Sequence, residues 1–360
     1  MTSLAALVEV VIGVDTHVDT HTAAAVDTHT GGVLAEVTVI TDPDGYAELV
    51  DFADRHSAVR AWAIEGTGGH GNGLTRLLVE RGEMIIELDR PERPHRRGGE
   101  KSDPLDAVRA AREAMSRSEL ATPRSSGDRQ ALSVLLAARR SAVQAAGDAK
   151  RQIFALVIAA PETLRTRFRG KKSPAMLTAA ARLRVHPNWD TETVTTAMVL
   201  RDLARRAVTL TSEANRHEQA ILAIVRSWRP ELLDQFGVGP VIAATILCAW
   251  SHPGRIRSEA AFAKLAGVAP IPANSGKIIT HWRLSRHGDR QLNRALHTIA
   301  ISRLRYDPTT KAYADRRTKE GKTRPEIRRC LKRYIARDLF RLLENPPTPP
   351  SARTSLTPTG

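Results

Sequence analysis

The sequence predicts a mixed α/β domain in its first third and a predominantly helical remainder. Three observations indicate this organisation. Short runs rich in β-branched residues alternate with amphipathic segments as far as about residue 116. Long proline-free stretches rich in Ala, Leu and Arg then follow from Arg129. The length of 360 residues exceeds that of one typical domain and indicates two or three.

The first third contains five predicted strands and three predicted helices. The strands are expected at residues 10–15, 22–27, 33–40, 59–65 and 84–88. The helices are expected after Thr41-Asp42-Pro43, through residues 74–78, and from near Asp103 with Ser102 as its cap. The order of three strands, helix, strand, helix, strand, helix is that of the ribonuclease-H-like fold. In that fold the first and fourth strands lie side by side.

Four acidic residues occupy positions that this fold brings to one edge of the sheet. Asp15 ends the first strand and Glu65 ends the fourth, while Asp103 and Asp106 share one face of the last helix. Four converging carboxylates repel one another unless divalent cations lie between them. Oxygen ligands of this kind suit Mg²⁺, or Mn²⁺. Two such ions support phosphodiester cleavage by activating a nucleophile and stabilising the leaving oxygen. The nearby histidines His17, His21 and His29 match no metal-binding spacing, and we expect them to be exposed structural residues of hairpins.

The middle of the chain predicts two long helices, at residues 129–160 and 192–228. A basic, proline-containing break is expected between them. The second helix has a regular seam of alternating four- and three-residue spacing, which is typical of a coiled coil. Its members are Leu203, Ala207, Leu210, Ala214, His217, Ile221, Ile224 and Trp228. This seam suits pairing with the other helix, with another subunit, or with both.

The last third contains features that suit nucleic-acid binding. Gly237-Val238-Gly239 precedes an apolar helix, and such a helix-hairpin-helix element lets backbone N–H groups approach a phosphate. Ser275 lies between Asn274 and Gly276, so that from its neighbours alone it is a turn residue beside the cation Lys277. A candidate phosphate-binding groove is formed by Arg283, Arg286, Arg290 and Arg294.

Charge and composition narrow the function. Residues 1–120 hold 12 Lys and Arg against 21 Asp and Glu, whereas residues 121–360 hold 42 against 18, for a net charge of +15. The basic part predicts a polyanionic partner, most commonly nucleic acid. The sequence has two cysteines, which are too few for a disulfide framework, and this cysteine content is typical of a cytoplasmic protein. The longest strongly apolar run, about ten residues at 241–250, is too short to span a membrane.

These motifs together resemble the transposases of the insertion-sequence-110 family. The resemblance covers residues 11–116 and about 231–320. It is carried by Gly13-Val14-Asp15-Thr16-His17, Ile64-Glu65-Gly66-Thr67-Gly68, Lys101-Ser102-Asp103-Pro104-Leu105-Asp106-Ala107, Ser275-Gly276-Lys277 and Leu284-Ser285-Arg286-His287-Gly288. The expected domains are a RuvC-like domain at 8–120, a helical coiled-coil region at 125–230, a transposase domain at 231–345 and a disordered tail at 346–360.

The resemblance implies a recombinase that excises and inserts its own element. It implies that Asp15, Glu65, Asp103 and Asp106 form the Mg²⁺ site and that Ser275 is the nucleophile that joins to DNA. It also implies a homo-oligomer, a dimer or tetramer, in which the two catalytic halves come from different subunits, and a structured guide RNA that recognises donor and target DNA. Two other functions fit the residues: a metal-dependent junction nuclease that uses water, and a non-catalytic helix-hairpin-helix DNA-binding protein.

Overall fold

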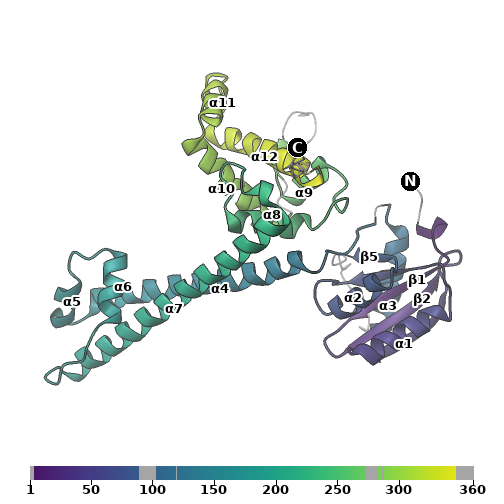
Figure 1. The fold of residues 1–360 in the computed structure, drawn as a ribbon. Coiled ribbons are helices and arrows are strands. Elements are labelled where there is room, and N and C mark those ends of the chain that lie inside the picture. Colours follow the sequence, from purple (N-terminus) through teal and green to yellow (C-terminus); the bar gives the residue numbers. More distant parts are fainter. Residues whose placement is uncertain (1–3, 89–102, 119, 273–281, 285–287, 346–360) are drawn as a thin grey trace, which may run out of the picture. The chain divides into compact units, whose positions relative to one another are not determined.

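The fold is that of a computed structural model of the chain, and it consists of two compact units, Met1–Ser126 and Gly127–Gly360. The structure describes residues 4–88, 103–118, 120–272, 282–284 and 288–345. Each unit has its own hydrophobic cores and is described by itself below (Figure 1).

The first unit is built on a mixed five-stranded sheet with the order β3-β2-β1-β4-β5. Its strands are β1 (Val10–Thr16), β2 (Thr20–Asp27), β3 (Val33–Ile40), β4 (Arg60–Glu65) and β5 (Ile85–Leu88). The first three strands form an antiparallel meander, whereas β1 pairs in parallel with β4, and β4 with β5. The sequence predicted all five strands to within a few residues, and the sheet confirms the mixed α/β class.

Helices cover both faces of this sheet. Helices α1 (Pro43–Asp54) and α2 (Asn72–Glu80) pack on one face, and α3 (Asp103–Ser116) packs on the other. Because side chains of a strand alternate between faces, Ile12 and Val14 of β1 enter the first core while Val11 enters the second. Helix α1 begins where expected, since the Asp42 carboxylate accepts a hydrogen bond from the Gly45 N–H.

The second unit contains a long antiparallel hairpin of α4 (Asp128–Ala159) and α7 (Thr191–Trp228), which lie side by side in Figure 1. Three of the eight residues of the predicted seam, Ala207, Ala214 and Ile221, are buried, whereas other buried residues of α7, such as Ala204 and Val225, lie outside that seam. Ala207 and Ile221 are fully buried within the single chain. Arg139 of α4 donates two hydrogen bonds to the Glu218 carboxylate of α7, at 3.1 and 2.8 Å. The buried part of the seam and this ion pair lie between the two helices of one chain, which supports the pairing of α4 with α7.

The segment between the long helices differs from the expected break, because it folds into α5 (Glu162–Phe168) and α6 (Ser173–Ala181). These helices share a core with the adjoining ends of α4 and α7, in which Leu164 and Phe168 are buried beside Ile153 and Leu200. Two of the three prolines that suggested a break lie at helix starts: Pro161 precedes the first residue of α5, and Pro174 is the second residue of α6. The segment is therefore a small folded helical module.

The remaining helices pack around the other end of the hairpin. They are α8 (Pro240–Trp250), α9 (Glu259–Leu265), α10 (Arg290–Tyr306), α11 (Pro308–Lys319) and α12 (Arg324–Glu344), with the short strands β6 (Pro270–Pro272) and β7 (Trp282–Leu284). Their core includes Leu132 of α4 and Ile221 of α7, so the hairpin and the C-terminal helices are packed together. Among the described residues, no helix is long and apolar enough to cross a membrane.

Candidate metal centre of the sheet domain

Two of the four predicted acids lie at the ends of neighbouring parallel strands. Val14 of β1 is in register with Ile64 of β4, and the next residues along the two strands are Asp15 and Glu65. Val14 and Ile64 face the core under α1 and α2. The alternation of side chains therefore directs Asp15 and Glu65 to the opposite face, which α3 covers.

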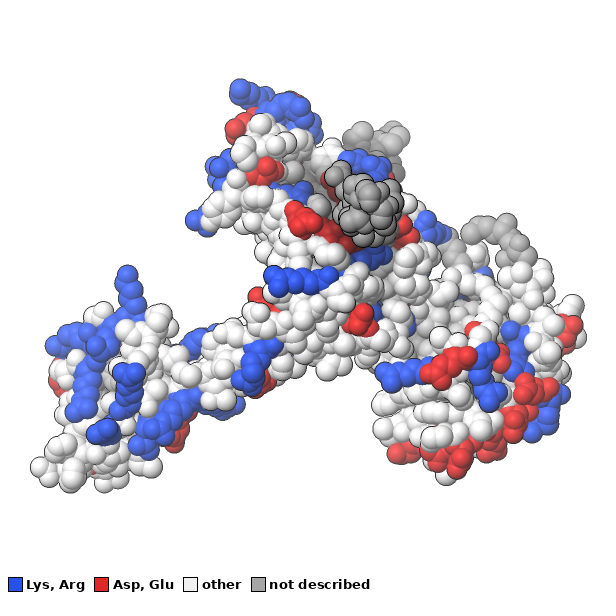
Figure 2. All heavy atoms as spheres, in the orientation of Figure 1, with Lys and Arg blue, Asp and Glu red and all other residues white. Residues whose placement is uncertain are grey.

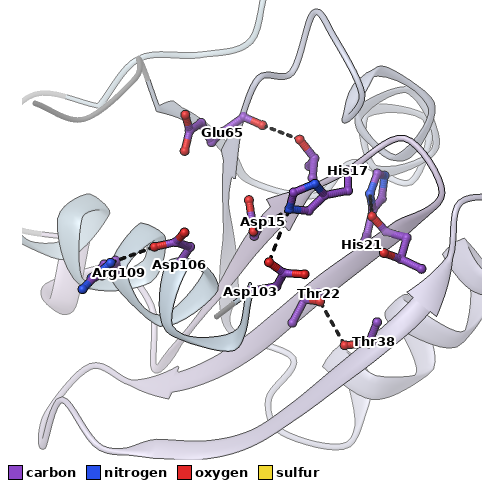
Figure 3. A network of polar contacts seen from close by, with 11 residues as sticks. Asp15, His17, His21, Thr22, Thr38, Glu65, Asp103, Asp106 and Arg109 are labelled. Carbon is purple, nitrogen blue, oxygen red and sulfur yellow. Dashed lines mark hydrogen bonds and ion pairs between the residues drawn. The ribbon is translucent and has the colours of Figure 1, made fainter. Parts of the chain in front are cut away.

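Helix α3 supplies the other two acids from its first turn, where Asp103 and Asp106 stand. The helix lies unusually close to β1, because position 13 is a glycine: a Cβ built there would be 2.0 Å from the Ala107 carbonyl oxygen. This close approach brings the first turn of α3 to the end of β1. In Figure 3, Asp103 and Asp106 of α3 and Glu65 of β4 are grouped around Asp15.

The described residues contain one cluster of possible metal-ligating side chains, formed by Asp15, His17 and Asp103. One ligand atom from each lies within 4.8 Å of the others. Glu65 and Asp106 stand outside this cluster of three. Asp106 accepts a hydrogen bond at 2.8 Å from Arg109, one helical turn further along α3. Of the four predicted acids, Asp15 and Asp103 are therefore the two whose carboxylates lie within this cluster.

The surroundings of Asp15 disfavour its charged form. Burial raises the pKa of Asp15 above its ordinary value, and the nearby carboxylates of Asp106 and Asp103 raise it further. His17 opposes this shift, through its charge and its hydrogen bond. A divalent cation would relieve the same unfavourable burial and repulsion, and carboxylate oxygens are suitable donors for Mg²⁺ or Mn²⁺. The residues present therefore fit a divalent metal.

The three histidines near the start of the chain differ from the expectation that all are exposed hairpin residues. The His17 Nε2 atom lies 3.2 Å from Asp15 Oδ2 and 3.5 Å from Asp103 Oδ1. His21 lies within β2, is fully buried, and stacks on Tyr46. Of the three, only His29 is exposed in a hairpin turn. Spacing rules for metal motifs missed His17, although it is two residues from Asp15 and directly follows the strand that carries Asp15.

Two hydroxyl contacts that the sequence did not indicate hold the end of the sheet in place. Thr16 Oγ1 donates a hydrogen bond to the Glu65 carbonyl oxygen at 2.9 Å, which ties the end of β1 to the end of β4. Thr67 Oγ1 donates to Glu87 Oε1 at 2.8 Å, in a fully buried contact between the loop after β4 and strand β5. Such contacts join residues 20 to 49 positions apart, and no local pattern predicts them.

The candidate residues of the C-terminal third are only partly described. Gly237 has a positive φ of 83° and packs against α10, whereas Gly239 precedes the first residue of α8. The element before this turn is a short 3₁₀-helix, Pro230–Leu232, rather than an α-helix. Arg290 and Arg294 are exposed on the first turns of α10. Arg283 lies in β7, while Ser275, Lys277 and Arg286 lie outside the described residues.

Comparisons with known proteins agree with the predicted family. Residues 12–159 match a family model described as a transposase of the DEDD type of the IS110 group, and residues 230–315 match the transposase IS116/IS110/IS902 family. An uncharacterized 42 kDa protein of insertion element IS900 from Mycobacterium paratuberculosis is 26% identical over 335 residues, covering 79% of this chain and 82% of the relative. An uncharacterized 43.6 kDa protein of insertion element IS110 from Streptomyces coelicolor is 33% identical over 116 residues, covering 32% of this chain and 29% of the relative.

The family match over residues 12–159 contains all four acids, and the family match over residues 230–315 contains the turn with Gly237 and Gly239. A sheet whose edge presents acids from two strands and a packed helix, in a chain that matches both regions, defines a DNA transposase. The chain belongs to the insertion-sequence-110 family of transposases.

Proposed function

We propose that this protein excises and inserts its own insertion-sequence element by cleaving and rejoining DNA. The observation that carries the proposal is the meeting of Asp15 and Asp103 at one end of the sheet, with Glu65 on the neighbouring strand and Asp106 on the same helix turn, inside the region that matches the DEDD transposases. The strand order and the packing of α3 beside β1 support a ribonuclease-H-like, RuvC-like fold for this unit.

The four acids are proposed to hold Mg²⁺, with Mn²⁺ as an alternative. When bound, the metal would supply Lewis acidity and charge neutralisation at the phosphodiester. The assignment is supported by the positions of the acids: Asp15 and Glu65 stand at the ends of two paired parallel strands, and Asp103 and Asp106 in the first turn of the helix that packs against β1.

Ser275 is proposed as the nucleophile, on the strength of the family resemblance and of the match over residues 230–315. In the cleavage step, the Ser275 oxygen forms a bond to phosphorus, the bond from phosphorus to one deoxyribose oxygen breaks, and the serine proton passes to a base. The released deoxyribose oxygen takes up a proton. In the rejoining step, a deoxyribose hydroxyl attacks the phosphoserine and releases the serine. The number of phosphodiester bonds is conserved, so the reaction needs no external energy source.

This chemistry combines residues of two separately packed units. The acids belong to Met1–Ser126, whereas Ser275 belongs to Gly127–Gly360. We therefore expect that the acids of one subunit and the serine of another meet on the same phosphodiester in a homo-oligomer, a dimer or tetramer. A structured RNA encoded by the element is proposed to select the donor and target DNA.

The nucleic acids are proposed to bind the basic C-terminal third. The proposed contacts are the backbone N–H groups at Gly237 and Gly239, together with Lys277, Arg283, Arg286, Arg290 and Arg294. The exposed positions of Arg290 and Arg294, four residues apart on α10, support this assignment because they lie on one face of the helix.

The metal half of the proposal is tested by strand cleavage of DNA that carries the element ends, with Mg²⁺ and with a chelator. Asp15→Asn and Asp103→Asn should abolish cleavage while leaving DNA affinity nearly unchanged, since neither side chain is proposed to bind DNA by its charge. Arg76→Gln, an exposed change on α2, is the control. Cleavage that continues in the chelator, or in both acid variants, would contradict the proposed metal site.

A further inference from the structure

His17 has a position that the set of four acids does not explain. Its Nε2 atom lies 3.2 Å from a carboxylate oxygen of Asp15 and 3.5 Å from one of Asp103, so the imidazole nitrogen points to the space that both acids face (Figure 3). The side chain is 42% exposed, which leaves the ring accessible to an ion from solvent.

The backbone places His17 there for a simple reason. Asp15 is the last residue but one of β1, and His17 directly follows the strand; where the chain stays extended, side chains two residues apart point to the same side. The backbone N–H of His17 donates a hydrogen bond to the Thr20 carbonyl oxygen at 3.0 Å, which closes the turn into β2. The orientation of the ring toward α3 is therefore a property of the strand and its turn, and it requires no special conformation.

From this geometry we infer that His17 is a nitrogen ligand of the metal centre and shifts its preference toward Mn²⁺ and Co²⁺ relative to Mg²⁺. This inference rests on the proposed metal site. Imidazole nitrogen is a softer donor than carboxylate oxygen, and it binds transition metals in preference to Mg²⁺. Two carboxylates and one imidazole on one face leave open positions for substrate oxygens, as catalytic sites require.

A different role for His17 gives the opposite result on substitution. If the imidazole only occupies the space between Asp15 and Asp103, a metal has to displace it. Removal of the ring would then strengthen metal binding. If the imidazole is a ligand, its removal weakens binding, most of all for the metals that favour nitrogen. The direction of the change in metal affinity therefore separates the two roles.

The experiment measures Mn²⁺ binding to the full-length protein by electron paramagnetic resonance, with nitrogen coupling detected by pulsed methods. Wild-type protein should show coupling to a directly bound nitrogen. His17→Ala should lose that coupling and bind Mn²⁺ about tenfold or more weakly, with a smaller loss for Mg²⁺ measured by competition. His29→Ala, in the exposed turn, is the matched control and should behave as wild type.

Wild-type protein that binds Mn²⁺ without nitrogen coupling would overturn the inference while leaving the acidic metal site in place. So would a His17→Ala protein that binds Mn²⁺ as tightly as wild type, or more tightly. Wild-type protein that binds neither Mn²⁺ nor Mg²⁺ would overturn the metal site itself, and this inference with it.

A second, independent feature is the basic surface of the α5–α6 module. Residues 161–189 contain seven Lys and Arg and a single acid, Glu162. Apolar side chains of the module, including Leu164 and Phe168, are buried in the core that it shares with α4 and α7. The cations therefore lie on the outside, and Figure 2 shows Lys and Arg gathered over the end of the hairpin that carries α5 and α6.

Most of these cations lack an acidic partner. Glu162 is shared by Arg165 and Arg169. Lys171, Lys172 and Arg184 are exposed, and within the described residues none of the three lies within ion-pair distance of a carboxylate. A rigid helical surface that presents several unpaired cations is suited to the phosphates of a nucleic-acid backbone. We propose that the α5–α6 surface binds the phosphodiester backbone of a nucleic acid, in addition to the C-terminal contacts.

The test is the salt dependence of binding by the full-length protein, measured by fluorescence anisotropy with a labelled DNA duplex and a labelled RNA hairpin. The triple variant Lys171→Gln, Lys172→Gln, Arg184→Gln should reduce the slope of log affinity against log salt by about 3 for the bound nucleic acid. A change confined to the DNA arm or to the RNA arm identifies which one the module contacts.

The matched control removes three exposed arginines from the acidic first unit, in the variant Arg55→Gln, Arg76→Gln, Arg81→Gln. This control should leave both slopes nearly unchanged. Equal slopes for wild type and the α5–α6 variant in both arms would overturn the proposal. An equal loss in the control would also overturn it, because the effect would then come from net charge alone.

Discussion

Replacement of Gly13 by alanine should move α3 and weaken the metal centre. A Cβ at position 13 would lie 2.0 Å from the Ala107 carbonyl oxygen and 2.7 Å from the Ala111 nitrogen. Both contacts are to backbone atoms of α3, which cannot rotate away as a side chain can. Ala107 directly follows Asp106, so the helix would be displaced at the turn that presents Asp103 and Asp106.

The size of the displacement follows from the geometry. Ordinary contact begins at 3.4 Å, so the Ala107 oxygen has to retreat by 3.4 − 2.0, or about 1.4 Å. Overpacking of this kind costs about 1–3 kcal/mol of the free energy of unfolding. A misplacement of about 1 Å in a catalytic group costs about a hundredfold in rate. We therefore expect Gly13→Ala to fold with reduced stability and to lose about a hundredfold in DNA cleavage.

Urea denaturation and DNA-cleavage rates of the full-length protein measure the two effects, and Mn²⁺ titration reports on the metal centre itself. Gly68→Ala is the matched control, because a Cβ at that position in the loop after β4 meets nothing within 4 Å. A Gly13→Ala protein that equals the Gly68→Ala protein in stability and in Mn²⁺ affinity would refute the close packing of α3 on β1 as the reason that the acids meet.

Three further outcomes are expected. Asp15→Asn should be as stable as wild type, or more stable, at pH 7 without metal. The pKa of Asp15 is raised in the folded state, so ionisation of Asp15 destabilises the fold as the pH rises above 3.8, the ordinary pKa of the group. Denaturation at pH 7 and again well below pH 3.8 checks this, since the gain should vanish at the acidic pH, and a large loss at pH 7 would make Asp15 a structural residue. Ile221→Ala should lower the free energy of unfolding by about 2–5 kcal/mol at every protein concentration, because Ile221 is fully buried within one chain; a loss that grows on dilution would assign the seam to a subunit interface. Mixing Ser275→Ala with Asp15→Asn protein should restore part of the covalent DNA adduct, whereas an inactive mixture would show that each subunit supplies both groups to one phosphodiester.

The part of the site that depends on strand ends was predictable from local pattern. Asp15 ends the β-branched run 10–15 and Glu65 ends the predicted strand 59–65, and acids at the ends of adjacent parallel strands come together in any sheet of this order. The structure confirms that adjacency. The position of Asp103 was also predictable, because Ser102 and Pro104 are typical of a helix start.

Two features were not predicted. One depends on contacts between segments that are distant in the sequence, and the other was missed because prolines were interpreted as ending helical structure. The cluster formed with His17 needs both the alternation of β1 and the closeness of α3, and spacing rules for metal motifs contain neither. The α5–α6 module was predicted as a break because of its prolines, yet Pro161 precedes the first residue of α5 and Pro174 occupies the first turn of α6. Proline is favoured at such positions, since the first N–H groups of a helix have no intrahelical partner.

The most direct test of the central claim is mass spectrometry of the protein–DNA species formed with Mg²⁺ and DNA that carries the element ends. The account predicts a phosphodiester between DNA and the peptide that contains Ser275. It also predicts that this species is absent from Ser275→Ala protein and from Asp15→Asn protein, although both still bind DNA. The serine mechanism would be contradicted if Ser275→Ala protein cleaved DNA at the normal rate, with Mg²⁺ required and no peptide attached to the products. That result would identify a nuclease that uses water.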